Sequence, residues 1–189
     1  MEIKRETAWQ LLTEFTHNDS LIKHALAVEA AMRAYAEKFG EDPEKWGFVG
    51  LIHDFDYEQH PTPEEHPQVG AGILEQRGFP PDIIYAVKSH AQHLNLARER
   101  PIEKTLFAVD ELCGFITAAT LVRPGKKIAE LPVSSVKKKL KDKAFARSVN
   151  REEIYESAAA LGVDLDEHIA FVIAAMARVA DRLGLAGSE

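Results

Sequence analysis

The chain has 189 residues, of which 46% are hydrophobic and 28% charged, and its formal net charge is −7 at pH 7. This balance is typical of a globular protein with a substantial core, and the negative charge argues against broad nucleic-acid binding. No apolar run reaches the roughly 18 residues of a membrane span, and the single cysteine excludes an internal disulfide. The charged N-terminus lacks the apolar stretch of a signal peptide, so we expect a cytoplasmic protein.

The first part of the chain has the apolar period of α-helices. We expect helices over residues 4–15 and 20–39, the second ending at Gly40, a residue suited to the position after a helix. Asp42-Pro43 then provides a capping residue and a first-turn proline for a helix that runs to His53.

Prolines divide the middle of the chain. Residues 55–65 predict an irregular loop, and short helices are expected from Pro67 to about Gly78 and from Pro81 to His90. Pro101 begins a long helix that ends at Arg123-Pro124-Gly125.

Three further helices are expected after that break. Ser134-Ser135 predicts the start of a basic helix, while Asn150 and Asp164, each followed three residues later by glutamate, resemble capping boxes. We therefore predict an all-α fold with residues 1–189 in a single helical domain. Its core spans about 20–116, and a basic C-terminal subdomain spans about 123–189.

The basic character of that subdomain is local. Residues 123–151 hold ten Lys and Arg against two acidic residues, a surplus of eight positive charges on a chain that is otherwise acidic. Such a segment can concentrate an anionic ligand, and a solvated lysine-rich helix face is the alternative.

Polar residues interrupt the apolar faces of the predicted helices. His24, His53 and Asp110 follow or precede apolar residues by three, four or seven positions, and Asp54 adjoins His53 at a helix end. A buried, unpaired carboxylate costs several kcal/mol, and a divalent cation would remove that cost. Each histidine alone is more typical of a hydrogen-bonded core residue, so the combination carries the prediction of a metal site.

The order His24, His53-Asp54, Asp110 resembles the signature of the HD-domain superfamily of metal-dependent phosphohydrolases. The resemblance implies a bundle of about five core helices with additional C-terminal helices, and these four residues as metal ligands. It also implies hydrolysis of a small phosphorylated compound, such as a nucleotide, by a metal-activated water.

The segments 66–74 and 83–90 are similar to the middle of the subgroup with a His-Asp-Ile-Gly motif. In members with two metal ions, His66 and His90 would bind the second ion and Asp54 would bridge the pair. Nitrogen and oxygen ligands without thiolate suit Mn, Fe, Co, Ni or Zn, as one ion or two.

One part of the motif departs from the family. Members often continue with Gly-Lys, where this chain has Asp56-Tyr57, so a lysine contact with substrate is not expected. Asp54, Asp56 and Glu58 are the candidate catalytic residues; the last two could transfer protons, position a neighbour or be solvated loop acids.

Other residues complete the hypothesis. Arg123, Lys126 and Lys127 follow the helix of Asp110 and are predicted to bind the substrate phosphate. His60 and His93 are rival metal ligands, while His17 and His168 are expected to be structural or on the surface.

Two other functions remain open from the sequence. The ligand set also resembles that of the mixed-valent di-iron oxygenases of the same superfamily, and a non-enzymatic metal- or ligand-sensing module is the third reading. We expect a small phosphorylated substrate as partner and no membrane, and the oligomeric state is left open.

Overall fold

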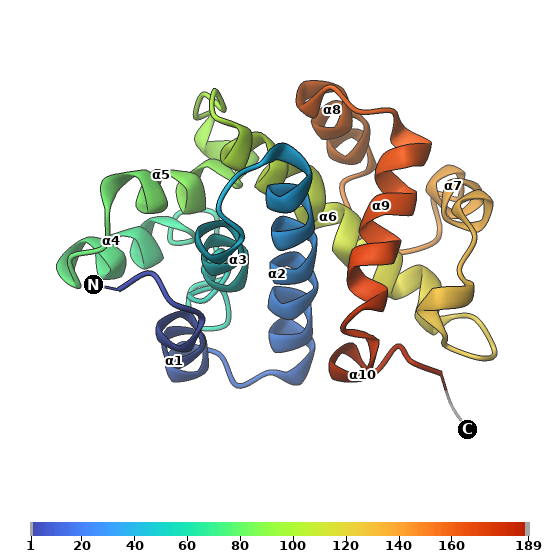
Figure 1. Ribbon diagram of the computed structural model, residues 1–189, viewed down its shortest axis with the longest axis horizontal. Coiled ribbons are helices and arrows are strands. Elements are labelled where there is room, and N and C mark those ends of the chain that lie inside the picture. The colour runs from blue at the N-terminus through green and yellow to red at the C-terminus, as the bar shows by residue number, and fades with distance from the viewer. Residues whose placement is uncertain (1, 188–189) are drawn as a thin grey trace.

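The computed structural model describes residues 2–187, and within them the chain forms ten α-helices, two short 3-10 helices and no β-strand (Figure 1). The predicted all-α fold is confirmed. The α-helices are α1 (Arg5–Phe15), α2 (Asp19–Phe39), α3 (Pro43–Ile52), α4 (Gln68–Gln76), α5 (Pro81–Ser89), α6 (Pro101–Leu121), α7 (Val133–Lys141), α8 (Arg151–Leu161), α9 (Leu165–Ala177) and α10 (Ala180–Leu183). The 3-10 helices are η1 (Gln92–Leu94) and η2 (Ile128–Glu130).

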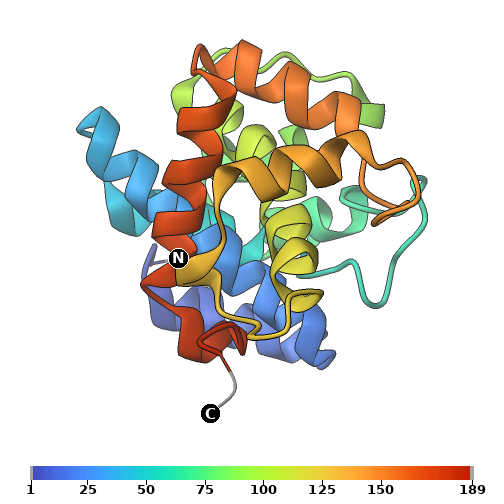
Figure 2. The same ribbon diagram turned by 90° about the vertical axis from the view of Figure 1, so that its right-hand side faces the viewer.

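The two longest helices, α2 and α6, occupy the middle of the bundle. Helices α1, α3, α4 and α5 lie on one side of this pair and α7 to α10 on the other (Figures 1 and 2). Helix α2 packs most extensively on α3, and Gly50 permits the close approach, since a Cβ there would lie 3.0 Å from the Val28 carbonyl oxygen. The result is a continuous core that spans both sides.

Capping side chains mark the start of four of the α-helices. Asn18, Asp42, Asn150 and Asp164 each accept hydrogen bonds from the first-turn backbone of α2, α3, α8 and α9. Gly40 follows α2 in the left-handed conformation, as expected. The predicted cap at Ser134-Ser135 is wrong, because α7 begins at Val133 directly after Pro132 and both serines lie inside its first turn.

The C-terminal helices pack on the same two central helices. His168 of α9 is buried, its Nδ1 lies 2.6 Å from the Tyr35 hydroxyl of α2, and its Nε2 donates to the Ala108 carbonyl of α6 at 2.9 Å. These contacts are those of a structural histidine. No helix in residues 2–187 is long and apolar enough to cross a membrane.

Candidate metal centre

Six potential ligands come from five separate parts of the chain. Helix α2 contributes His24, α6 contributes Asp110, and His53 and Asp54 stand just beyond the last residue of α3. His66 lies in the turn region before α4, and His90 directly follows α5. The C-terminal ends of α3 and α5 lie close together, and the rings of His53 and His90, which follow them, are 5.3 Å apart. There they meet His24 of α2 and Asp110 of α6.

The first group of ligand atoms surrounds Asp110. The Asp110 Oδ1 lies 2.9 Å from His24 Nε2 and 3.4 Å from His53 Nε2. His53 Nε2 is also 3.5 Å from Asp54 Oδ2. Oxygen and nitrogen atoms bound to one ion at about 2.1 Å lie roughly 3 Å from one another, so this spacing suits a single cation.

The second group surrounds the other oxygen of Asp54. His66 Nε2 and His90 Nε2 each lie 3.2 Å from Asp54 Oδ1 and 3.2 Å from each other. In the described part of the chain, His24-His53-Asp54 and Asp54-His66-His90 are the groups that bring three potential ligand atoms within 4.8 Å. Asp54 is shared by both, one oxygen facing each group.

The outer nitrogens of three histidines are occupied by acceptors. His53 Nδ1 donates to the Gly50 carbonyl at 2.8 Å, His90 Nδ1 to the Val87 carbonyl at 2.5 Å, and His66 Nδ1 to Asp56 Oδ1 at 2.9 Å. A neutral imidazole that donates from Nδ1 presents a lone pair at Nε2. All three lone pairs therefore point inward at the carboxylates, which is the orientation of metal-ligating histidines.

That orientation requires a cation. The Nε2 atom of His53 is fully buried and has no hydrogen-bond partner among the described residues, and the facing lone pairs of His66 and His90 would repel one another. A proton or a metal ion between the donor atoms removes both costs. The residues present fit a divalent metal ion.

The charges of the site shift its pKa values. Burial lowers the pKa of His53 and His66, but the neighbouring carboxylates outweigh burial: Asp54 and Asp110 for His53, Asp54 and Asp56 for His66. The pKa of each histidine is raised to about 9. Burial alone would raise the pKa of Asp54 and Asp110, yet the adjacent histidines hold both well below the usual range.

Asp56 is fully buried and stands behind His66, away from the open side of the site. Its Oδ1 accepts the His66 bond, and its Oδ2 accepts from the Gly70 amide at 2.8 Å. Only glycine suits position 70, because a Cβ there would meet the Asp56 carboxyl carbon at 2.7 Å. The geometry matches the positioning role considered for Asp56.

The structure does not bring Glu58 to the ligands. Its carboxylate is exposed and accepts hydrogen bonds from the backbone amides of His17 at 2.7 Å and Asn18 at 2.9 Å. These bonds lower its pKa and tie the loop to the start of α2.

The ligands open into a cavity of about 470 Å³, which we call the metal cavity. No lysine or arginine of residues 2–187 lines it. Its walls are His24, Asp54, Tyr57, His66, His90, Ala91, Gln92, His93, Asp110, Glu111, Gly114, Asn150 and Glu153.

Sequence reasoning missed the acidic wall of this cavity. Burial, and then the nearby Asp110 carboxylate, raises the pKa of Glu111 to about 7; burial and then Glu111 do the same for Glu153. Glu111 could have been suspected as the neighbour of Asp110. Glu153 had no signal beyond its place near a helix start.

The predicted phosphate-binding residues lie elsewhere. Arg123, Lys126 and Lys127 follow the C-terminal end of α6, and Arg123 is 13 residues beyond Asp110. At about 1.5 Å per residue this is roughly 20 Å along the helix axis. None of the three lines the metal cavity, and Lys127 pairs with Glu130 at 2.9 Å.

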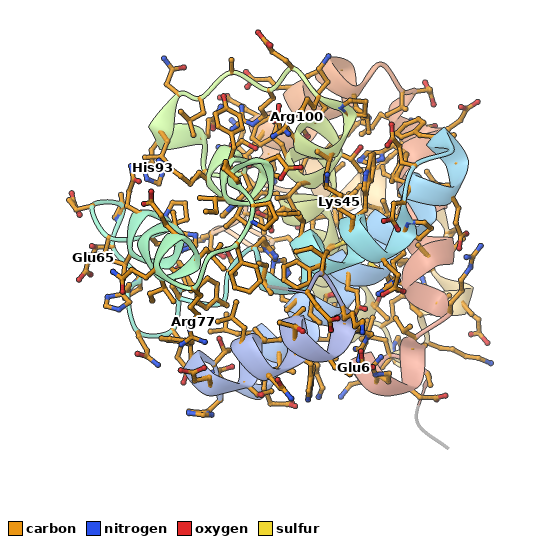
Figure 3. All side chains as sticks on the ribbon, turned by 60° about the vertical axis from the view of Figure 1, so that its left-hand side comes forward. Glu6, Lys45, Glu65, Arg77, His93 and Arg100 are labelled. Atoms are coloured by element: carbon orange, nitrogen blue, oxygen red, sulfur yellow. The ribbon has the colours of Figure 1, made fainter. Side chains whose placement is uncertain are left out.

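The rival histidines take different places. His60 faces Glu65 at 3.4 Å, and neither belongs to a ligand group. His93 is exposed at the rim of the metal cavity, on the same side of the molecule as Glu65 (Figure 3). His17 is on the surface, as expected.

A helical bundle that gathers four histidines and two aspartates about one shared carboxylate defines a metal-binding domain of the His-Asp type. The family model of the HD domain matches residues 21–114, which include all six potential ligands, and through this segment the chain belongs to the HD-domain family. The predicted family is confirmed.

Two curated relatives give a more distant likeness. The chain is similar to ribonuclease Y of Nitratidesulfovibrio vulgaris strains DP4 and Hildenborough, with 29% identity over 116 residues in each case. The alignments cover 61% of this chain and 20% of the relatives, so the chain spans about a fifth of their length. No solved structure matches the chain.

Proposed function

We propose that the chain is a metal-dependent phosphohydrolase that binds two divalent ions and cleaves a phosphate ester with water. The observation that carries the proposal is the shared Asp54 carboxylate. Each of its oxygens faces a separate group of histidine nitrogens, and both groups face the metal cavity. A closed structural site would bury all its ligands, whereas His24, Asp54 and Asp110 are part-exposed to the cavity.

Divalent ions bound here would supply Lewis acidity, both to acidify a water and to neutralise phosphate charge. The protein's part is to hold and orient the ligands. The carbonyls of Gly50 and Val87 fix the rings of His53 and His90, and the Asp56 carboxylate fixes His66. This preorganisation keeps three basic nitrogens directed at the ions.

Tyr57 replaces the familiar lysine with a neutral donor. It lies in the wall of the metal cavity, its ring 5.2 Å from that of His66. Its hydroxyl can donate a hydrogen bond to a phosphate oxygen without adding charge. The positive charge for the phosphate then comes from the ions alone, because lysine and arginine are missing from the cavity walls in the described chain.

The comparisons support a phosphate ester as substrate. The HD domain covers the whole ligand set, and the relatives are named for cleavage of RNA, a phosphodiester. A cavity of about 470 Å³ is within the size range of small-molecule sites.

The test is metal analysis of the purified protein followed by a phosphate-release screen over nucleotides and simple esters, with His53→Ala and Asp54→Ala as controls. We expect turnover in the wild type and none above background in either variant. Turnover that survives in both variants would contradict the proposal. Oxygen consumption by an iron-loaded protein without phosphate release would favour the oxygenase, and ligand binding without turnover the sensing module.

A further inference from the structure

A second cavity adjoins the metal centre. It has a volume of about 290 Å³ and lies between the start of α2 and the C-terminal half of α6, with Leu183 and Gly184 at the end of α10 closing it. We call it the side cavity. Its walls combine the apolar side chains of Leu121 and Leu183 with the ammonium of Lys23, which pairs with Asp19 at 2.6 Å.

The two cavities share two wall residues, His24 and Gly114. His24 is a ligand of the first metal group. A Cβ built on Gly114 would meet no atom within 4 Å, so the backbone at this position borders open space. The two cavities therefore adjoin beside the metal centre, at a position where α6 carries no side chain.

One face of α6 contributes to the walls of both cavities. Asp110, Gly114, Thr117 and Leu121 are spaced by four, three and four residues, which places them in one stripe along the helix. The stripe is about 16 Å long at 1.5 Å per residue. Asp110 stands at one end of the stripe, in the metal cavity with Glu111 and Glu153, and Thr117 and Leu121 at the other end line the side cavity.

A phosphate held at the metal centre is therefore next to both cavities. A phosphomonoester carries one organic group and fills one of the cavities, while a phosphodiester carries two and fills both. The cavities also differ in chemistry. The metal cavity presents carboxyl and amide groups to hydrogen-bond donors, while the side cavity presents leucine side chains, two hydroxyl groups and the Lys23–Asp19 ion pair.

We propose that the substrate is a phosphodiester whose two organic groups occupy the two cavities, and that Gly114 is the specificity-determining residue that keeps them joined. The inference rests on the proposed function. In the reaction a P–O bond forms to water and one ester P–O bond breaks. One water proton passes to the leaving alkoxide, which departs as an alcohol, and the product is a phosphomonoester.

Gly114→Leu tests the inference because its side chain would extend into the space where the two cavities adjoin, while its Cβ would meet no atom within 4 Å. The position is helical and its Cβ would be unhindered, so helix propensity favours the variant. We expect its KM for a dinucleoside monophosphate to rise at least about tenfold more than its KM for p-nitrophenyl phosphate, because only the diester has to occupy both cavities; tenfold is the scale on which pocket shape discriminates. Gly114→Ala should give a smaller rise.

Gly72→Leu is the matched control. Gly72 is also helical with nothing within 4 Å of a built Cβ, but it lies in α4 and lines neither cavity. Binding of a methylphosphonate-linked dinucleoside, measured by calorimetry, gives a readout independent of turnover and should weaken in Gly114→Leu only.

Equal effects of Gly114→Leu on both esters, or the same effects in Gly72→Leu, would overturn the inference and leave the proposed function standing. Absence of hydrolysis of every phosphate ester by metal-loaded wild type would overturn both.

Discussion

Asp56 Oδ1 accepts a hydrogen bond from His66 Nδ1 at 2.9 Å, and this contact decides which nitrogen of His66 faces Asp54. The Asp56 side chain is 1% exposed and lines no part of the metal cavity. It acts on the site only through His66, whose Nε2 it directs towards His90 and the shared carboxylate.

Replacing Asp56 with asparagine should weaken metal binding at the Asp54-His66-His90 group. The neutral amide lowers the basicity of His66, and one of its two ends must turn an N–H towards a donor, either His66 Nδ1 or the Gly70 amide. Loss of such a partner typically reduces metal affinity about 10–100-fold. Titration of the metal-depleted protein by calorimetry measures the effect.

Glu58→Gln is the control for that substitution. Glu58 stands two residues further along the same loop, is exposed, and contacts backbone amides of His17 and Asn18 in place of a ligand. Its removal should leave metal affinity unchanged within error. Unchanged affinity in Asp56→Asn as well would show that the carboxylate does not tune His66.

Metal stoichiometry should separate the two ligand groups. His90→Ala removes a ligand from one group, and His24→Ala from the other, so each variant should retain about one of two ions. Asp54→Ala removes the carboxylate that both groups share and should retain neither tightly. Elemental analysis after extensive dialysis counts the ions. Two ions retained in Asp54→Ala would exclude it as the bridge.

The stability of the metal-free protein should depend on pH through the same residues. The pKa of His53 and of His66 is raised to about 9, so protonation of each stabilises the fold fully below about pH 6.5, the unfolded value, and this contribution is lost as the pH rises through 9. The lowered pKa values of Asp54 and Asp110 give a contribution that is present above about pH 4 and lost in stronger acid.

Thermal unfolding of chelator-treated protein across pH 4–10 checks this. The melting temperature should fall between about pH 6.5 and 9. Because a metal ion must displace the His53 and His66 protons, apparent metal affinity should rise over the same interval. A metal affinity independent of pH there would contradict the charge state inferred for the histidines.

The ligand set could be predicted from sequence because its residues obey local rules. His24 and Asp110 interrupt apolar stripes of long helices, where a polar residue is conspicuous, and capping residues such as Asp42 fix where the neighbouring helices begin. The structure agrees on both helices within a residue or two.

The rest of the site depends on long-range packing that carries no local pattern. Glu153 reaches the metal cavity only because α8 packs on α6, and the side cavity beside Gly114 exists only because α10 packs against α2. The course of the chain after α6 could not be predicted from a local sequence pattern either. It leads Arg123 away from the metal centre instead of back over it.

The contact between Tyr35 and His168 should matter for folding but not for catalysis. Tyr35→Phe removes the partner of the buried His168 Nδ1, a contact that joins α9 to α2 and includes no residue of the ligand groups. An unsatisfied buried group costs about 1–3 kcal/mol, and each kcal/mol lowers the melting temperature by about 2–4 °C in a protein of this size.

Calorimetric unfolding of Tyr35→Phe also tests the single-domain prediction. If the chain is one cooperative unit, the variant unfolds in one transition at lower temperature, with kcat and metal content unchanged. A second transition that moves alone would show that the C-terminal helices unfold separately from the metal-binding core.

The basic residues after α6 should distinguish small substrates from extended ones. Combined neutralisation of Arg123, Lys126 and Lys127 to glutamine should leave KM for p-nitrophenyl phosphate unchanged, because they start roughly 20 Å along α6 from Asp110. They follow Leu121 at the far end of the side cavity, where the chain pairs with the segment after α10, so a longer polyanionic ester could reach them. KM for a trinucleotide should therefore rise, and the rise should disappear at high salt, where exposed charges are screened.

The control is a second triple variant with the same loss of charge, in which Lys138, Lys139 and Lys141 of α7 are changed to glutamine. None of these three lysines lines either cavity. An equal effect of both triple variants would show that overall charge, and not the position of Arg123, Lys126 and Lys127, attracts the substrate.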